Sequence, residues 1–544
     1  MNIKIALPLL WLVLLASPAL ADTYNLDIAR ETVNVTGTPV KKITINGTIP
    51  GPTLHFREGE DVTVHVTNHM DVPTSIHWHG FLIPAKMDGV PGFNGFPGIM
   101  PGQTFTYRFK VRQSGTYWYH SHSGGQEQDG VYGGIVITPK GKDPIKADRD
   151  YVVLLSDFTN ESPQEILGNL KMDSGYYNYA KPTVGDFFSD VEKKGFKAAW
   201  SEASDWWKMR MSPADLSDVS GYTFLMNGKT REQNWTGIFK PGQRVRLRFI
   251  NASAMSFYDV RIPGLKMTVV AADGQDVEPV PVDEFRFGIA ETYDVIVQPK
   301  DDKAYTIAAE SIDRTGFALG TLALHEGMKG EAPTPRPRTL LKMGDMGGMD
   351  MSDMVMTPAD MKSGWAEAGT PEGHKALSYA DLRYAGIQKD TRQPDRTIEV
   401  HLGGNMERYI WTINGKKFSD AGPIKLRYGE RVRLTFINDT MMAHPMHLHG
   451  MFVQLENGQP AEKLPNKHTV IVPPGQSYSV LLTANEPGEW AFHCHLLYHM
   501  LSGMMRKVVV AKLDAADMPA EKTSPEPVKM DMDMPMEGGR HAAH

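Results

Sequence analysis

The tripeptide His493-Cys494-His495 limits what this chain can be more than any other stretch, because Cys494 is its only cysteine. An internal disulfide is excluded, so the thiol needs another partner. His499 and Met504 follow at short spacing. One thiolate, His nitrogens and a weakly bound Met are the donor set of a blue-copper electron-transfer site. The stretch therefore predicts such a site, completed by a second His from elsewhere in the chain.

The two His that flank Cys494 indicate further metals. Side chains alternate along a strand, so His493 and His495 would point away from Cys494 and could not bind the same ion. They would bind other metals on the opposite side, and the tripeptide would bridge two metal sites. The alternative is a buried Cys with incidental His neighbours, and the spacing of His499 and Met504 argues against it.

The N-terminus has the pattern of a secretory signal at residues 1–21. Lys4 precedes a short apolar run, and Ala19-Leu20-Ala21 precedes Asp22, as at a cleavage site. A membrane anchor is the alternative, but the run is short for a span. No twin Arg is present, which favours the general secretory route. We therefore expect an exported, periplasmic protein without a membrane span after cleavage.

Length and charge narrow the class further. A chain of 544 residues is expected to form three or four domains. Its net charge is −7 and it has no basic run, which argues against nucleic acid as a partner.

Three repeated stretches indicate how the chain is divided. Each starts with an Asn-Gly turn, at Asn46, Asn227 and Asn414, and continues through a Gly turn into an alternating strand. Abundant Gly and Pro, short strands and no long helical periodicity predict an all-β fold of β-sandwiches. The expected domains are residues 22–150, 151–330 and 385–513, joined by an insert at 331–384 and followed by a tail at 514–544.

The repeats place His residues at matching positions. The first strand ends at Asn68, and His77 and His79 follow nine and eleven residues later. The third copy has three His at the matching offsets of six, nine and eleven, whereas the middle copy has apolar residues there and is expected to be a spacer or wall. The three His of the third copy are His444, His447 and His449.

The ends of the outer domains also match. The segment through His120-Ser121-His122 aligns with the segment through His493-Cys494-His495, so Ser121 falls where Cys494 falls. The first domain keeps two flanking imidazoles but lacks the thiolate. It can share a metal cluster, but it cannot hold a blue copper.

His444 completes the set with Cys494, His499 and Met504. Eight His remain, four from each outer domain, and three coppers between these domains would use them as two, three and three. A zinc site would need only about four ligands. The eight are His77, His79, His120, His122, His447, His449, His493 and His495, whereas other His such as His55, His65 and His468 are expected to be ordinary surface or core residues.

Four motifs in this order resemble the signatures of multicopper oxidases, and the resemblance covers the chain to about residue 513. It implies three consecutive cupredoxin-like Greek-key β-sandwich domains and four copper ions. The motifs are His77-Trp78-His79-Gly80, His120-Ser121-His122, His444-Pro445-Met446-His447-Leu448-His449, and His493-Cys494-His495 with His499.

Carried over by motif, the resemblance also implies a role for each ligand. Type 1 copper would bind His444, Cys494, His499 and Met504. Type 2 copper would bind His77 and His447. One type 3 copper would bind His79, His120 and His495, and the other His122, His449 and His493.

The implied reaction passes single electrons from a donor at type 1 copper through Cys494 to the cluster, where dioxygen is reduced to water. Asp88 stands where the family has a proton-relaying acid, although an Asp before Gly89 is also typical of a turn. Some relatives carry a Glu after the last type 1 His, where this chain has Met500. The second proton-handling acid is therefore unassigned, with Glu127 and Asp129 as candidates.

Methionine is abundant, at 31 residues, and seven lie within 343–361. Thioethers suit Cu(I) and neighbouring carboxylates suit Cu(II). These segments and further Met near the type 1 motifs resemble the bacterial copper-resistance branch of the family, the CopA-type oxidases. We therefore expect Cu(I) oxidation in copper tolerance, with phenolic donors as further substrates. The alternatives are a laccase-like enzyme for phenols or aromatic amines, and a copper-sequestering protein.

Overall fold

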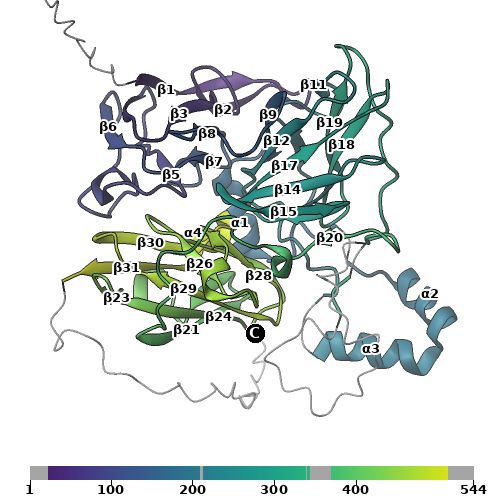
Figure 1. Cartoon of the computed structure of the whole chain (residues 1–544). Helices are drawn as coiled ribbons and strands as arrows, with labels where there is room; N and C mark the ends of the chain where they lie inside the picture. Colours follow the sequence, from purple (N-terminus) through teal and green to yellow (C-terminus); the bar gives the residue numbers. More distant parts are fainter. Residues whose placement is uncertain are drawn as a thin grey trace, which may run out of the picture.

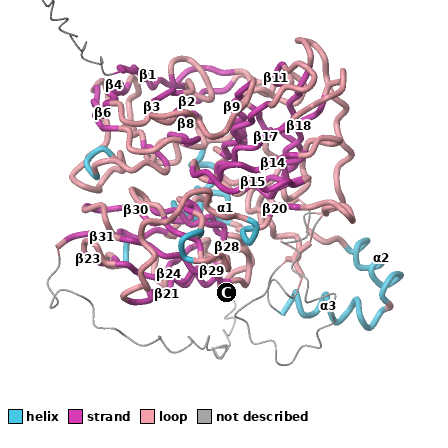
Figure 2. The backbone as a smooth tube through the Cα atoms, in the orientation of Figure 1, coloured by secondary structure: helices cyan, strands magenta, loops and turns pink. Residues whose placement is uncertain are grey.

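The computed structural model describes most of the chain as three β-sandwiches (Figures 1 and 2). The signal at 1–21, the Met cluster at 343–361 and the tail at 514–544 lie outside the described residues. Within the described ranges, no helix is long and apolar enough to cross a membrane. The described residues are 22–179, 181–208, 212–338, 340–342, 365 and 369–512.

The first sandwich packs two four-stranded sheets around an aromatic and aliphatic core that includes Trp78 and Tyr107. One sheet has the order β2 (Val40–Ile45), β1 (Asp22–Val33), β4 (Asp61–Asn68) and β6 (Thr104–Lys110). The other has the order β3 (Leu54–Arg57), β8 (Tyr132–Thr138), β7 (Gly115–His120) and β5 (His77–His79), and the 3-10 helix η1 (Ala85–Met87) follows β5.

The second sandwich has two six-stranded sheets. One has the order β10 (Thr223–Met226), β9 (Arg149–Phe158), β12 (Val245–Asn251), β17 (Thr292–Val297), β14 (Met267–Ala272) and β15 (Gln275–Val282). The other has the order β11 (Trp235–Ile238), β19 (Phe317–Ala323), β18 (Tyr305–Ser311), β13 (Tyr258–Arg261), β16 (Glu284–Phe287) and β20 (Ala376–Leu377).

The third sandwich carries the tripeptide. One sheet has the order β22 (Ile410–Ile413), β21 (Arg396–Asn405), β24 (Arg431–Asn438), β29 (Ser477–Thr483), β26 (Val453–Leu455) and β27 (Asn466–Lys467). The other has the order β23 (Ile424–Arg427), β31 (Met505–Ala511), β30 (Gly488–Cys494), β25 (His444–Leu448) and β28 (Thr469–Val472). Short helices here are η3 (Tyr379–Asp381), η4 (Phe418–Asp420), η5 (Ala461–Lys463) and α4 (Leu497–Leu501).

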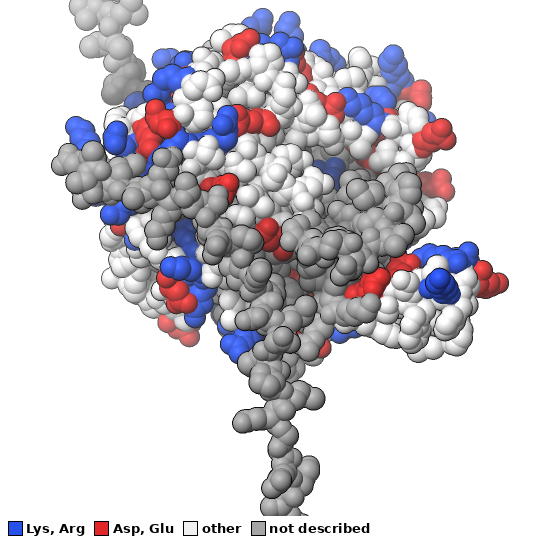
Figure 3. Space-filling view, turned by 90° about the horizontal axis from the view of Figure 1, so that it is seen from below, with Lys and Arg blue, Asp and Glu red and all other residues white. Residues whose placement is uncertain are grey.

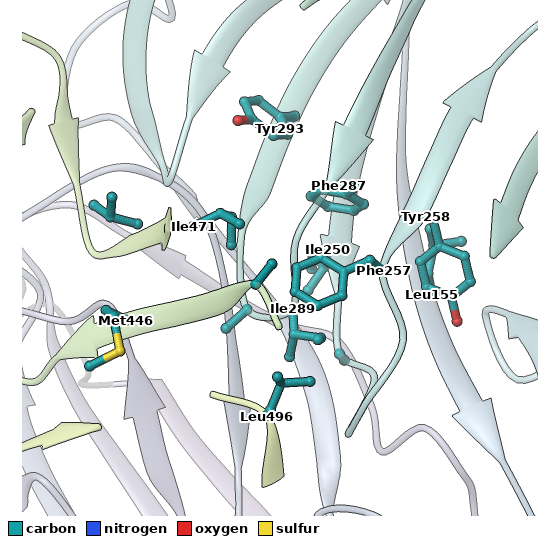
Figure 4. Close-up of a cluster of buried hydrophobic side chains, with 14 of the residues drawn as sticks. Leu155, Ile250, Phe257, Tyr258, Phe287, Ile289, Tyr293, Met446, Ile471 and Leu496 are labelled. Atoms are coloured by element: carbon teal, nitrogen blue, oxygen red, sulfur yellow. The ribbon is translucent and has the colours of Figure 1, made fainter. Parts of the chain in front are cut away.

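The second and third sandwiches share one apolar cluster (Figure 4). Phe257 and Ile289 of the second sandwich and Met446 and Leu496 of the third belong to it, and all four are nearly inaccessible to solvent. Burial of apolar surface is worth about 25 cal/mol per Å², so a shared core of this kind holds the two sandwiches in a fixed arrangement. Met446 and Leu496 adjoin predicted ligands, and the cluster therefore fixes the strands on which those ligands lie.

The Asn-Gly turns of the three repeats adopt the same structure. Asn46, Asn227 and Asn414 all have φ near +50°, a conformation that Asn tolerates better than most residues. Each side chain accepts a backbone N–H from the first strand of its own sandwich, at 2.6–2.8 Å. The recurrence of one turn with one set of hydrogen bonds shows that the sequence repeat is a structural repeat.

A second Asn in each repeat fixes the segment that leads to the ligand strand. Asn438, at the end of β24, donates through its side-chain amide to the carbonyl oxygens of Met442 (2.7 Å) and Val472 (3.0 Å). Val472 lies opposite His444 in the sheet. Asn68 and Asn251 make equivalent pairs of bonds in the first and second sandwiches. The Asn of each repeat thus sets where the next strand starts.

Three helices depart from the expected absence of long helical segments. They are α1 (Pro163–Met172), α2 (Val184–Lys194) and α3 (Phe196–Lys208), and α2 and α3 project from the second sandwich (Figure 1). Ser162 and Thr183 begin α1 and α2 with capping boxes to Glu165 and Asp186, a signal that the sequence contained. Phe188 of α2 and Trp207 of α3 are exposed. Lys, Arg, Asp and Glu side chains are interspersed on the face in Figure 3.

Replacing Asn438 with Ala should loosen His444 and lower the stability of the copper-free protein by about 1–3 kcal/mol, the cost of leaving buried carbonyl groups unpaired. Asn251→Ala is the matched control, because it removes the same bonds from the domain without predicted ligands. Urea unfolding followed by Trp fluorescence should show both losses, and only Asn438→Ala should weaken the visible absorption of the copper-loaded protein. Equal absorption in the two variants would contradict the assigned role of Asn438.

Candidate metal centre

Two pairs of adjacent strands carry most of the predicted ligands. In the first sandwich, β5 pairs with β7 and places His77 opposite His120. In the third, β25 pairs with β30 and places His447 opposite His493. Alternation along β5 directs His77 and His79 to one side and Trp78 into the sandwich core. The sheet register thus presents imidazoles from both outer sandwiches.

Eight predicted His meet in one cluster between the first and third sandwiches. The ring of His77 stacks on that of His449 with 3.8 Å between centroids, and the ring of His79 stacks on that of His447 at 3.7 Å. All eight rings are buried except that of His122, which is half-buried. The other members, each with a ring contact to the group, are His120, His122, His493 and His495.

One nitrogen of several of these rings is held by a protein acceptor. The Nδ1 of His77 lies 2.9 Å from the carbonyl oxygen of Asp88, and the Nδ1 of His447 lies 2.6 Å from that of His468. Among the described residues, no partner faces the Nε2 of either ring, nor the Nδ1 of His79. A buried polar atom without a partner lowers the stability of a protein. A metal, however, needs a ring nitrogen that is free while the other nitrogen of the same ring is held by an acceptor.

Other ring nitrogens face one another. The Nε2 atoms of His120 and His495 are 3.3 Å apart, and those of His449 and His493 are 3.1 Å apart. Burial and the neighbouring His lower the pKa values of His120 and His449, and burial lowers the pKa of His493 to about 4. These three imidazoles are therefore neutral, which is the form that binds a metal. The donor set fits copper ions bound by nitrogen.

The thiol has its own group of donors. The Sγ of Cys494 lies 3.5 Å from the Nδ1 of His444 and 3.8 Å from the Nδ1 of His499, and the two Nδ1 atoms are 3.3 Å apart. All three side chains are buried, and burial raises the pKa of the Cys494 thiol. A metal cation among these atoms would compensate for that desolvation. Met504 is fully buried, and its carbonyl oxygen accepts the N–H of Cys494 at 3.1 Å.

The imidazoles of His444 and His499 also have contacts on the side away from the thiol. The Nε2 of His444 lies 2.7 Å from the Oγ1 of Thr440. The ring of Trp411 stacks on that of His499 at 3.7 Å. Both imidazoles are fully buried, so neither edge lies open at the surface.

The second domain, expected to be a spacer or wall, reaches the thiol site through Asp218. Its Oδ2 accepts from the Nε2 of His499 at 2.7 Å and from the hydroxyl of Tyr409 at 2.6 Å. Its Oδ1 is buried without a partner in the described part of the chain. Burial raises the pKa of Asp218, and burial together with Asp218 raises that of Asp215. No motif surrounds Asp218, so the sequence contained no signal for it.

Asp88 binds ligands from both outer domains. Its Oδ2 lies 2.9 Å from the Nδ1 of His449, and its Oδ1 lies 3.3 Å from the Nδ1 of His77. Its backbone N–H also ends η1 by donating to Ala85, and Gly89 follows with φ +79°. Asp88 therefore lies in a turn and also contacts two predicted ligands, and its role as a proton relay stays a prediction.

The two candidates for a second acid lie in different places. The Oε2 of Glu127 lies 2.8 Å from the Nδ1 of His120, and burial raises the pKa of Glu127 well above its usual value. Asp129 instead forms ion pairs with Arg30 (2.9 Å) and Lys42 (3.1 Å). Only Glu127 contacts a ring of the eight-His cluster among these two residues.

His468 was expected to be an ordinary residue, but it lies against the cluster. It is buried, and its Nδ1 is 3.2 Å from the Nε2 of His79. It stands outside the repeated His positions, which is why the motif spacing did not single it out. The Met residues near the thiol motifs are mostly part of the core, namely Met441, Met442, Met446, Met451 and Met505, whereas Met500 is half-buried.

Three family models, each described as multicopper oxidase, match residues 27–142, 149–326 and 391–514. The chain is 49% identical to copper resistance protein A of Escherichia coli, over 90% of this chain and 92% of that protein. It is 50% identical, with the same coverage, to a copper resistance protein A homolog of Pseudomonas syringae pv. tomato.

Solved structures agree with the fold. Fet3p, described as a multicopper oxidase that functions in iron import, superposes with a TM-score of 0.68 at 22% identity, over 90% of both chains. A laccase from Botrytis aclada superposes with a TM-score of 0.65, also at 22% identity, over 92% of this chain and 89% of that one. The predicted fold class is confirmed. The chain belongs to the multicopper oxidase family, whose members are oxidoreductases built from cupredoxin-like β-sandwiches.

Proposed function

We propose that this protein is an exported, periplasmic oxidase that couples the oxidation of Cu(I) to the reduction of dioxygen, in copper tolerance. The reaction balances as four Cu(I), one O2 and four protons giving four Cu(II) and two H2O. Two relatives at about half identity are named for copper resistance, and residues 1–21 resemble a secretory signal. The observation that carries the proposal is the contact between the buried carboxylate of Asp218 and His499.

The ligand assignment uses the nitrogens that the protein leaves free. Type 2 copper would bind the Nε2 atoms of His77 and His447, which are buried without a partner in the described structure. The thiol site would hold type 1 copper. Bound copper would accept electrons singly and supply four of them to dioxygen. The complete proposed set is His444, Cys494, His499 and Met504 for type 1, His77 and His447 for type 2, His79, His120 and His495 for one type 3 ion, and His122, His449 and His493 for the other.

The chain supplies a short path between the two sites. Cys494 is bonded through the backbone to His493 and His495, which belong to the eight-His cluster. An electron that arrives at the Sγ of Cys494 therefore has to cross only one residue to reach a cluster ligand. The strand alternation that separates the side chains is also what places the two sites back to back.

The surroundings of His499 favour a small cationic donor. Organic donors need an exposed ring edge to approach, whereas His444 and His499 are both fully buried. Asp218 lies directly on the Nε2 of His499, and Asp215 adds a second carboxylate. Burial raises the pKa of both acids, and a cation bound between them would displace a proton and favour their charged form. Cu(I) bound there would lose its electron through a carboxylate and an imidazole.

The laccase-like alternative also has support, because the chain is 28% identical to laccase-1 of Cryptococcus neoformans over 90% of its length. Copper sequestration alone does not explain the eight-His cluster, since storage needs no path from a thiolate to a second site. Oxygen uptake with Cu(I) and with a phenol, measured side by side on the copper-loaded protein, separates the two enzymatic functions.

Asp218→Asn tests the Cu(I) proposal. The amide keeps an acceptor for His499 but removes the charge, so Cu(I) oxidation should fall roughly 10-fold or more, as for the loss of a charged contact worth about 1.5–3 kcal/mol. Phenol oxidation by the same variant is the internal control and should change little. Oxygen-electrode kinetics with both donors give the comparison. An equal loss for both donors would favour a role in tuning His499, and no loss for Cu(I) would place its entry elsewhere.

Cys494→Ser tests the division into two sites. The variant should lose its intense blue absorption and its oxidation of either donor, because the hydroxyl cannot replace the thiolate. The eight-His cluster should still bind copper. Visible spectra and copper analysis of the purified variant measure the two effects separately. A variant that stays blue, or that folds but holds no copper, would contradict the assignment.

Asp88→Asn and Glu127→Gln test the supply of protons to the eight-His cluster. Each substitution keeps the shape and the acceptor for a ligand ring, but removes a group that can carry a proton. Dioxygen reduction should slow about 10²-fold or more, with copper content preserved. Asp129→Asn is the control, because it breaks ion pairs with Arg30 and Lys42 and should affect stability alone. Turnover under limiting oxygen is the measurement, and unchanged turnover would return Asp88 to the role of a turn residue.

A further inference from the structure

His468 occupies a fixed position between β27 and β28. Its backbone N–H donates to the Oδ2 of Asp273 at 3.0 Å, and its carbonyl oxygen accepts from the Nδ1 of His447 at 2.6 Å. Its ring is 2% exposed and lies against Gly80, where a Cβ would come within 2.4 Å of the ring. The ring therefore cannot swing toward Gly80, and a larger residue at position 80 could not be accommodated.

His79 is oriented the opposite way from its neighbours. His77 and His447 have their Nδ1 atoms held by carbonyl oxygens and their Nε2 atoms free. In His79 it is the Nε2 that has neighbours, namely the Nδ1 of His468 and the Oγ1 of Thr469, each at 3.2 Å. The Nδ1 of His79 is buried and has no partner among the residues described. Nδ1 is thus the nitrogen of His79 that remains for a metal.

A neutral imidazole carries a single proton. To offer a lone pair at Nδ1, His79 must carry its proton at Nε2, and a buried N–H needs an acceptor. Two atoms lie within reach of that N–H, the Nδ1 of His468 and the Oγ1 of Thr469, each at 3.2 Å, and His468 accepts at Nδ1 when its own proton is on Nε2. Other second nitrogens in the cluster face carboxylate or carbonyl oxygens, which serve His449 and His493, for example. The close Nε2 pairs His120–His495 and His449–His493 join rings that both belong to the eight-His cluster, whereas the Nε2 of His79 faces a His outside it.

We propose that His468 is a positioning residue that selects the Nε2-protonated form of His79, so that Nδ1 faces type 3 copper. The same residue orients His447 through its carbonyl oxygen, and it thereby links one ligand of the type 3 pair to one of type 2. This inference rests on the proposed copper assignment. Outer partners of this kind typically affect metal affinity by about 10- to 100-fold.

Three substitutions of His468 test whether its ring acts as a hydrogen-bond acceptor or only by filling space. His468→Asn places an amide atom where Nδ1 lies and can accept from His79. His468→Gln places its amide farther out, near the position of Nε2, and His468→Leu has no acceptor. Thr469→Val removes the other neighbour of the His79 Nε2. All four variants keep the backbone groups that hold Asp273 and His447.

Copper binding by the full chain is the measurement, with the near-ultraviolet band of the coupled copper pair and the blue band of Cys494 recorded together. The Gln and Leu variants should lose the coupled-pair band and bind cluster copper about 10- to 100-fold more weakly, whereas the Asn variant and Thr469→Val should stay near wild type. The blue band should persist in every variant, and thermal melting of the copper-free proteins checks folding.

The other outcomes contradict the proposal in distinct ways. Equal losses in the Asn and Leu variants would mean that the ring acts through its volume. Full retention by the Leu variant would mean that no acceptor is needed, and a loss confined to Thr469→Val would make Thr469 the acceptor. If the Leu variant did not fold, the contrast between Asn and Gln would still decide. Absence of a coupled-pair band in the wild-type protein would instead overturn the copper assignment.

Discussion

Buried imidazole nitrogens without protein partners are the constraint on which the rest of this structure depends. Eight His from two sandwiches converge, and burial together with the neighbouring rings lowers the pKa values of His120, His447 and His449, so that these rings are neutral. Packing these rings together leaves lone pairs such as the Nε2 of His77 with no donor in the described chain. Such a cluster costs free energy until metals bind it. The acceptors behind the rings then decide which nitrogen of each ring remains available.

Several of those acceptors come from residues outside the four His motifs. Asp88 supports rings from both outer sandwiches, Glu127 supports His120, and the carbonyl oxygen of His468 supports His447. The second sandwich contributes in two ways. Asp273 fixes the backbone of His468, and Asp218 contacts His499. The shared apolar cluster in Figure 4 makes such contacts between sandwiches possible, because it packs the second and third sandwiches against each other.

The sequence by itself determined the all-β class, the threefold repeat and the family. These follow from local patterns: strand alternation, the Asn-Gly turns, and His pairs at equal offsets from Asn68 and Asn438. Local patterns also contained the capping boxes at Ser162 and Thr183, so the helices of the second sandwich were predictable from residues that the strand-based interpretation did not use. These patterns involve residues that are close together in the chain. Because their spacing does not depend on the fold, they can be identified from the sequence alone.

Only the tertiary structure decided the contacts between residues far apart in the chain. Asp218 meets His499 across 281 positions, and His468 meets His79 across 389. Neither residue stands in a repeat or a motif, because its role depends on where another sandwich places its partner. Tertiary packing likewise gives different partners to Glu127 and Asp129, which are two positions apart. Glu127 contacts His120, and Asp129 contacts Arg30 and Lys42. The residue types of the predicted ligands are a property of the sequence, whereas the fold decides which nitrogen of a ring such as that of His79 or His447 faces a protein partner.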